Sequence, residues 1–149
     1  MAITLSLRYN KFMSNYSLFT DAGSRGNPGK ASYGIFLFKD DRLLDFKGKY
    51  IGIKTNNQAE FIALKDGLEL TLKNRITDIQ CFADSELLVK QINGVYKIKN
   101  VELKSIINDI KTLSLNFNSI TFTHIPREKN KFADKMVNII LDNVNYDRS

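Results

Sequence analysis

The sequence YSLFTDAGSRGNPGKASYG, residues 16–34, places one carboxylate, Asp21, between an apolar run and a loop rich in Gly, Ser, Asn and Pro. The apolar run predicts a short buried strand that ends on Asp21. A carboxylate at that position loses hydration, which costs several kcal/mol unless a partner replaces the water. Asp21 is therefore expected either to cap the turn that follows or to bind a positively charged group.

The segments that follow predict a mixed α/β domain. Residues 31–53 indicate two strands joined by a polar hairpin tip at residues 39–42. Further strands are expected at residues 78–84 and 119–125, and helices at residues 55–74, 85–94, 101–113 and 130–144. The order β-β-β-α-β-α-α-β-α indicates a five-stranded mixed sheet, in which parallel strands are added to an antiparallel meander through helical crossovers.

Apolar positions at helical spacing predict the buried faces of two helices. They are Ala59, Ile62, Ala63, Leu68 and Leu72 in the first helix, and Val101, Ile106, Ile107, Ile110 and Leu113 in the third. The first helix is expected to be capped by Thr55, Asn56 or Asn57. Glu60 is expected in its first turn, where a negative side chain suits the helix dipole.

Four acidic residues stand where this topology would gather them. Asp21 and Asp84 each end a buried strand, while Glu60 and Asp134 lie near the starts of helices. The C-terminal ends of parallel strands and the N-termini of the helices that follow share one edge of a sheet. Carboxylates gathered there repel each other and raise each other's pKa unless a cation neutralises them.

Oxygen ligands without a Cys–His cluster favour a hard cation, Mg²⁺ or Mn²⁺, over zinc. Two such ions about 4 Å apart would activate a water and stabilise the leaving oxygen in a phosphodiester displacement. Taken singly, each acid also has a structural explanation, as a turn cap, a charge at a helix start or a solvated surface group. A chance gathering of all four at one edge is the weaker interpretation.

Composition limits the class of protein without choosing its partner. The 149 residues carry a net charge of +6 and have a pI near 9.4, which fits a single domain that is simply soluble or that binds a polyanion. No apolar run reaches the ~20 residues of a membrane-spanning helix, and residues 1–13 lack the order of a secretory signal. The single Cys81 excludes an intramolecular disulfide, so we expect a cytoplasmic protein.

Four segments, in order along the chain, resemble the ribonuclease H type 1 family. TDAGSRGNPGKASYG is similar to the first strand and Gly/Asn/Pro loop of that family, and TNNQAE to its Thr-Asn-Asn-x-x-Glu helix start. ADSELLV is similar to its Asp-Ser-x-x-Val segment, and PREKNKFADKMVN to its Asn-x-x-x-Asp closing helix. The resemblance implies a ribonuclease H-like fold over residues 16–149, with residues 1–15 as an N-terminal extension.

The resemblance also implies a metal-dependent endonuclease that cuts the RNA strand of RNA–DNA hybrids and leaves a 5′-phosphate and a 3′-hydroxyl. Asp21, Glu60, Asp84 and Asp134 would be the catalytic acids and the ligands of two Mg²⁺ ions, with Mn²⁺ as an alternative. Asp21 would bridge both ions. The partner would be an RNA–DNA hybrid, with double-stranded RNA as a further candidate, and the enzyme would be a monomer.

Polar residues around the acids are the expected substrate contacts. Amide side chains both donate and accept, so Asn27, Asn56 and Asn57 are expected to contact 2′-hydroxyls and base edges in a wide minor groove. The same residues can equally serve as caps and turn formers. By resemblance, Thr55 would bind a phosphate of the DNA strand. Arg127 is always charged and can fork onto a phosphate, so it is expected to assist near the scissile group.

The sequence departs from the family pattern at several positions. Glu86 stands where an amide is common, which does not match a base contact, and Ala22 stands where glycine is usual. His124 lies in the alternating segment SITFTHI, so it is predicted to be a strand residue rather than the loop histidine of many members. The basic helix of some bacterial members is absent, and the basic residues near that point either replace part of it or form a solvated face: Lys90, Lys97, Lys99 and Lys104.

Other functions are compatible with such a fold. A non-catalytic module would hold hybrid or double-stranded nucleic acid, but massed carboxylates oppose phosphate binding. Another nuclease of the same superfamily, such as a resolvase or an exonuclease, would share the acids but not the Asn-rich loop and the TNNQAE motif. The domain is also compatible with a role as the nuclease part of a larger polymerase or viral system.

Overall fold

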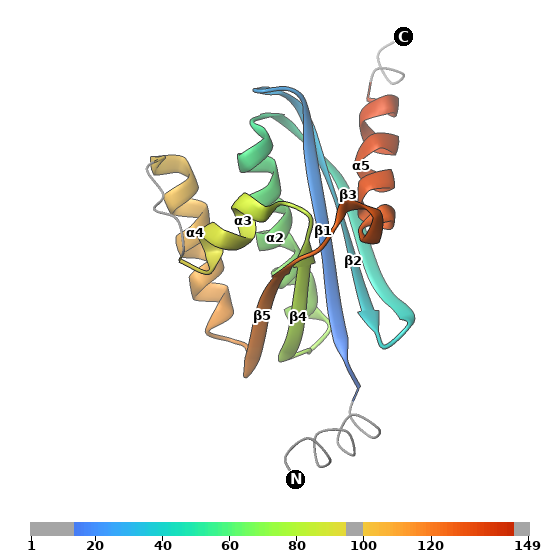
Figure 1. Cartoon of the computed structure of the whole chain (residues 1–149), viewed down its shortest axis with the longest axis vertical. Coiled ribbons are helices and arrows are strands. Elements are labelled where there is room, and N and C mark those ends of the chain that lie inside the picture. The colour runs from blue at the N-terminus through green and yellow to red at the C-terminus, as the bar shows by residue number, and fades with distance from the viewer. Residues whose placement is uncertain (1–13, 95–99, 145–149) are drawn as a thin grey trace.

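The computed structural model describes residues 14–94 and 100–144 of this chain (Figure 1). The elements follow the order predicted from the sequence. They are β1 (Tyr16–Gly26), β2 (Gly29–Lys39), β3 (Arg42–Lys54), α2 (Asn56–Lys73), β4 (Asp78–Ala83), α3 (Glu86–Ile92), α4 (Val101–Ser114), β5 (Ser119–His124), a 3₁₀ turn (Arg127–Lys129) and α5 (Lys131–Asn143). The proposed extension at residues 1–15 lies outside the described residues except for Ser14 and Asn15.

The sheet has five strands in the order β3-β2-β1-β4-β5. The pairs β1–β2 and β2–β3 are antiparallel, whereas β1–β4 and β4–β5 are parallel. Asp40 and Asp41 form the turn between β2 and β3, so the predicted hairpin tip is confirmed. The mixed sheet therefore has the predicted composition, an antiparallel meander followed by parallel strands joined through helices.

Helices cover both faces of the sheet. Figure 1 shows α2 and α4 on one side and α5 on the other. Residues of β1 alternate between these faces. Leu18 and Thr20 are buried against Gly67 of α2, so Phe19 and Asp21 point to the side of α5. The alternation of β1 thus assigns Asp21 to the same face of the sheet as Phe19.

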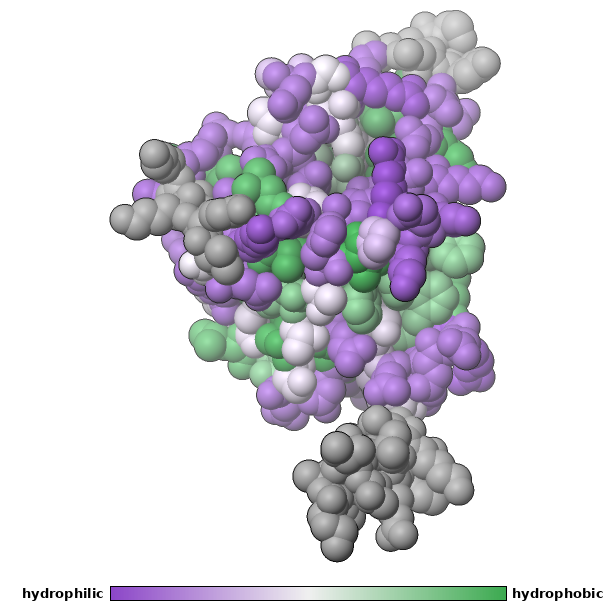
Figure 2. Space-filling model, in the orientation of Figure 1, coloured by the Kyte–Doolittle hydropathy of each residue, from purple (hydrophilic) through white to green (hydrophobic). Residues whose placement is uncertain are grey.

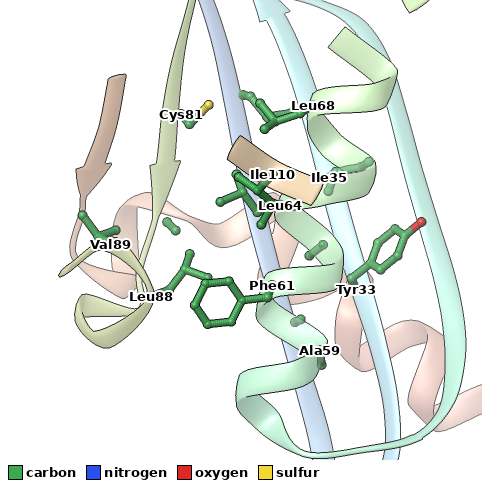
Figure 3. Packing of buried hydrophobic residues seen from close by; sticks show 14 of the residues in the cluster. Tyr33, Ile35, Ala59, Phe61, Leu64, Leu68, Cys81, Leu88, Val89 and Ile110 are labelled. Carbon is green, nitrogen blue, oxygen red and sulfur yellow. The ribbon is translucent and has the colours of Figure 1, made fainter. Parts of the chain in front are cut away.

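The main core lies between α2 and the sheet. Figure 3 shows Phe61, Leu64 and Leu68 of α2 in one buried cluster with Ile110 of α4 and Leu88 of α3. Of the predicted positions, Ala59, Ala63 and Leu68 are fully buried, while Ile62 and Leu72 pack at the edge of the cluster. Phe61 and Leu64 complete the buried face that periodicity alone did not identify.

The predicted inner face of α4 is wrong at its first residue. Val101 is 79% exposed, because it opens the helix and points away from α2. Leu103 takes its place and is buried together with Ile107 and Ile110. The spacing of these three residues is that of one helix face.

None of the helices in the described part of the chain combines the length and apolar character needed to cross a bilayer.

The position of α5 depends on two strand glycines. A Cβ atom at Gly34 would lie 2.7 Å from the Ala133 carbonyl oxygen and 2.8 Å from the Met136 Cβ. A Cβ at Gly48 would lie 2.7 Å from atoms of both Met136 and Ile140. Glycine inside a strand often marks such a close approach. The absence of side chains at these positions lets α5 lie directly on β2 and β3.

Gly34→Ala is therefore expected to displace α5 and to lower the free energy of unfolding by about 1–3 kcal/mol, because the added methyl meets backbone at Ala133. Urea denaturation followed by circular dichroism measures this change. Gly23→Ala is the matched control, since its Cβ would lie 3.4 Å from the Val137 Cγ1, an ordinary contact. Equal stability losses in the two variants would contradict the close approach.

Candidate active site

The two strand-end acids become neighbours through the parallel pairing of β1 with β4. In this pairing Thr20 lies opposite Ala83. Asp21 directly follows Thr20, and Asp84 directly follows Ala83. The predicted gathering is present, since Asp21, Glu60, Asp84 and Asp134 all line one cavity of about 400 Å³. Arg127, Asn56 and Asn138 also line it.

Glu60 reaches the cavity from α2, although not from the predicted first turn. The helix begins at Asn56, so Glu60 lies in its second turn, and no acidic residue occupies the first. Thr55 is the cap among the three candidates: its hydroxyl accepts from the Gln58 backbone N–H at 3.1 Å, and the Thr55 N–H donates to Gln58 Oε1 at 2.9 Å. Because this capping box begins the helix at Asn56, Glu60 is turned toward β1 and β4.

Asp134 reaches the cavity from α5, as predicted, and Asn130 positions the start of that helix. Asn130 is 2% exposed, and its Nδ2 donates to the carbonyl oxygen of Thr20 at 2.9 Å. Thr20 immediately precedes Asp21, so this bond ties the start of α5 to the strand that carries the first acid. Arg127 lies across the cavity and donates from Nη2 to Asp134 Oδ1 at 3.1 Å.

Burial and mutual repulsion hold two of the acids toward the protonated form. Burial, followed by the charges of Asp84, Asp134 and Glu60, raises the pKa of Asp21 to about 8, although the Ala22 N–H opposes this shift by donating to Asp21 Oδ1 at 2.9 Å. Burial and the charge of Asp84 raise the pKa of Glu60 to about 7, against a hydrogen bond with Ser85. The cavity therefore favours a cation that would offset this repulsion.

The donor set fits a hard divalent cation, although the side chains do not form a closed metal cage. Within residues 14–94 and 100–144, no three His, Cys, Asp or Glu side chains are arranged to hold a metal ion as they stand. Asp134 Oδ1 accepts a hydrogen bond from Arg127, and Asp21 Oδ1 accepts one from the Ala22 N–H. In favour of a metal site, Glu60 Oε2 is buried without a hydrogen-bond partner. A carboxylate oxygen of this kind suits Mg²⁺ or Mn²⁺ as a ligand.

Two predicted substrate contacts, Asn27 and Asn56, link the β1–β2 loop to the start of α2. Asn27 Oδ1 accepts from the Asn56 backbone N–H at 3.0 Å, and Asn56 Oδ1 accepts from the Ser24 N–H at 2.9 Å. Asn56 lines the cavity, whereas Asn27, Thr55 and Asn57 do not. The β1–β2 loop is thus fixed to the start of α2, which supports the structural role of these residues alongside any role in binding.

The structure shows the positions of two residues that depart from the family pattern, His124 and Glu86. His124 is the last residue of β5, as predicted, and it is exposed and not part of the cavity lining. Glu86 forms an ion pair with Lys90 at 2.7 Å. Lys97 and Lys99 lie outside the described residues, so their role as part of a basic surface stays a prediction.

Sequence reasoning missed two supporting residues. Ser85 caps α3 by accepting from the Leu88 N–H at 3.2 Å, and it also hydrogen-bonds Glu60. Its signal is a serine between a strand-end acid and a helix. The bond from Asn130 to Thr20 has no comparable signal, because these residues are 110 positions apart in the chain.

The sheet order, the helices on its two faces and the acids at the ends of the central parallel strands define a ribonuclease H-like α/β fold. The model of the reverse transcriptase-like family matches residues 19–139. The chain belongs to the ribonuclease H type 1 family.

Solved structures and curated relatives agree on this family. RNase H1 from Halobacterium salinarum superposes with a TM-score of 0.84 at 34% identity, over 87% of this chain and 99% of that one. LC11-RNase H1, isolated from compost and crystallised with an RNA/DNA hybrid, gives a TM-score of 0.78 at 38% identity, over 83% of this chain and 94% of that one. A bifunctional protein of Mycobacterium tuberculosis is 36% identical over 82% of this chain.

The chain spans only part of the curated relatives that it matches. The aligned region covers 34% of the mycobacterial protein and 63% of the curated ribonuclease HI of Halobacterium salinarum, which is 35% identical over 83% of this chain.

The raised pKa values predict how the stability of the metal-free protein depends on pH. Asp21 has an ordinary pKa of 3.8 and a folded pKa of about 8, so the folded state binds more protons than the unfolded chain between these limits. The free energy of unfolding should therefore fall as the pH rises through this range. In chelator, the melting temperature of the wild type should fall from about pH 5 to about pH 8. Asp21→Asn should flatten this dependence and raise the melting temperature at the upper end by a few degrees.

Differential scanning calorimetry across this pH range is the measurement. Asp109→Asn is the control, because Asp109 is exposed and pairs only loosely with Lys65 at 3.7 Å. Adding Mg²⁺ should raise the melting temperature of the wild type more at high pH than at low pH. If Asp21→Asn leaves the pH dependence of the melting temperature unchanged, the pKa of Asp21 is not raised as proposed.

Proposed function

We propose that this protein is a metal-dependent endoribonuclease that hydrolyses the RNA strand of RNA–DNA hybrids and leaves a 5′-phosphate and a 3′-hydroxyl. The observation that carries the proposal is the convergence of Asp21, Glu60, Asp84 and Asp134 on one cavity, with the pKa values of Asp21 and Glu60 raised by burial and by their neighbours. Such repulsion is unfavourable in a module that only binds phosphate. Residues 16–149 would form the nuclease domain and residues 1–15 its extension.

The four acids would hold two Mg²⁺ ions, or Mn²⁺, which when bound would activate the attacking water and stabilise the leaving oxygen. Within the chain, Asp21 and Asp84 are held by the paired ends of β1 and β4, so their positions are set before substrate arrives. Glu60 offers a buried oxygen that no other group satisfies. Asp134 Oδ1 would have to be released by Arg127 before it could act as a ligand.

Arg127 would exchange its carboxylate partner for a phosphate of the RNA strand. It is exposed, it lines the same cavity as the acids, and the pair with Asp134 shows that its guanidinium reaches the centre of the site. An arginine binds phosphate with two parallel hydrogen bonds, which orients the group as well as neutralising it. Release of Asp134 and capture of phosphate would then occur together.

The amides at the start of α2 would read the minor groove of the hybrid. The Oδ1 atoms of Asn27 and Asn56 accept hydrogen bonds from backbone N–H groups. The Nδ2 group of each side chain would therefore act as a donor to the substrate. A 2′-hydroxyl of RNA accepts such a bond, and this group distinguishes RNA from DNA. Asn57 would contact 2′-hydroxyls and base edges in the same groove, and Thr55 would bind a phosphate of the DNA strand.

Asp21→Asn should lower the rate of hybrid cleavage by more than about a hundredfold, because it removes a charge from the centre of the proposed metal site. The assay follows a hybrid labelled on the RNA strand, with Mg²⁺ or Mn²⁺ and then with excess chelator. Asp109→Asn, far from the site, should cut at the wild-type rate. The wild type should lose all cutting in chelator.

Double-stranded RNA and duplex DNA, run in the same assay, separate the other functions. Cutting of duplex DNA in preference to hybrid would favour another nuclease of this superfamily. Binding of hybrid without cutting in either metal would rule out the proposed enzyme and leave a binding module.

Arg127→Ala should lower the cleavage rate by about tenfold to a hundredfold, since a forked contact to phosphate is lost. Arg127→Lys should recover only part of the rate, because lysine keeps the charge but not the planar fork. Single-turnover kinetics at saturating hybrid measures this step apart from binding. Full activity of Arg127→Ala would show that Arg127 serves only as a partner of Asp134.

A further inference from the structure

A row of six phenylalanine rings crosses the face of the sheet that carries Asp21. Neighbouring ring centroids lie 5.1–6.3 Å apart along the row, in the order Phe82, Phe19, Phe38, Phe132, Phe36 and Phe46. The rings come from four strands and from the start of α5. Two of them are largely exposed, Phe132 at 66% and Phe46 at 54%. Exposed aromatic rings that stand on such a row form an apolar patch, and a patch of this kind commonly marks a binding site.

Part of this row forms the wall of a second cavity, of about 340 Å³. Phe19, Phe38 and Phe132 supply its aromatic surface. Charged residues stand on two sides of these rings. The hairpin tip contributes Asp40 and Asp41, the 3₁₀ turn contributes Lys129, and the start of α5 contributes Lys131. In Figure 2, apolar surface is visible beside hydrophilic surface on the side of the molecule below α5. The cavity thus combines flat apolar walls with separate acidic and basic groups.

The aromatic cavity adjoins the catalytic cavity along two elements. Phe19 and Asp21 lie on the same face of β1, two residues or about 7 Å apart. Phe132 and Asp134 are likewise two residues apart at the start of α5. A chain of nucleotides with one phosphate at the acids would reach the aromatic cavity within one or two steps.

We propose that the aromatic cavity binds an unpaired nucleotide of the RNA strand that flanks the hybrid at the catalytic site. The base stacks on Phe132 and Phe38, because aromatic side chains bind any base through its face. Lys129 and Lys131 bind the phosphate of this nucleotide. The proposal rests on the proposed function, and it extends the substrate class from uniform hybrid to hybrid with a single-stranded RNA flank.

Asp41 favours a nucleotide over a purely apolar occupant. The exposed carboxylate of Asp41 can accept a hydrogen bond from the amino group of a base, whereas an apolar peptide would make no use of it. Asp40, its neighbour, is already engaged, since its Oδ1 accepts from the Asn15 N–H at 3.0 Å. A paired base is stacked between its neighbours inside the hybrid, so only an unpaired base can offer its face to the aromatic rings.

The test compares a blunt hybrid with the same hybrid extended by a few RNA nucleotides at the 5′ or the 3′ end, the first unpaired base being 2-aminopurine. All measurements use the full chain carrying Asp21→Asn with Mg²⁺, so that the RNA stays intact. Anisotropy gives the Kd, and 2-aminopurine fluorescence reports stacking. Each variant is scored by the ratio of its Kd for blunt hybrid to its Kd for extended hybrid.

One of the two extensions should strengthen binding by on the order of tenfold and quench the 2-aminopurine. Adding Phe132→Ala should bring the ratio close to one, while Phe132→Tyr should retain it. Leu115→Ala is the matched control, because Leu115 is 86% exposed at the end of α4, outside the lining of both cavities. The ratio of this control should equal that of the Asp21→Asn protein.

Equal binding of blunt and extended hybrids would overturn the inference while leaving the proposed function in place. An equal gain from an extension on the DNA strand would overturn the assignment to RNA. A dimer in sedimentation that Phe132→Ala dissociates would show that a second copy covers the cavity. Failure of the blunt hybrid itself to bind would overturn the proposed function, which separates that result from the others.

Discussion

The parallel pairing of β1 with β4 at the centre of the sheet is the constraint on which the site depends. It ends at Thr20 and Ala83, so Asp21 and Asp84 follow side by side. The backbone of neither residue can move away without disturbing the ladder in the middle of the sheet. This arrangement is electrostatically unfavourable, because the carboxylates of Asp21 and Asp84 are held near each other in a partly buried place. Helices α2 and α5 then bring Glu60 and Asp134 to the same cavity.

The fold holds α5 against the sheet by close contact rather than by bulky packing. Gly34 and Gly48 remove the side chains that would stand under the helix, and Asn130 bonds to Thr20 beside the first acid. Small residues and one buried amide thus control where Asp134 lies. The same placement brings Phe132 against Phe36 and Phe38 of β2, so one helix start contributes to the acidic cavity and to the aromatic cavity.

Within the described structure, Arg127 is the cation that partly balances the acids, through its bond to Asp134. The raised pKa values of Asp21 and Glu60 show that this balance is incomplete. A divalent cation would therefore bind to a site that is already under repulsion, and its binding energy would include relief of that repulsion. Stability and the binding of such a cation would be coupled at the same residues for this reason.

The sequence by itself determined the order of the elements, the hairpin tip at Asp40 and Asp41, and the four acids, because strand and helix periodicity and residue chemistry are local properties. It wrongly predicted Val101 as buried, since exposure depends on the neighbouring elements. It also placed Glu60 one helical turn too early, since the start of the helix depends on which of Thr55, Asn56 and Asn57 is the cap. Only the tertiary structure decided that Arg127 meets Asp134, that Asn130 reaches Thr20 and that six phenylalanines form one row. These contacts join residues from different elements, and a one-dimensional pattern carries no information about which faces will meet.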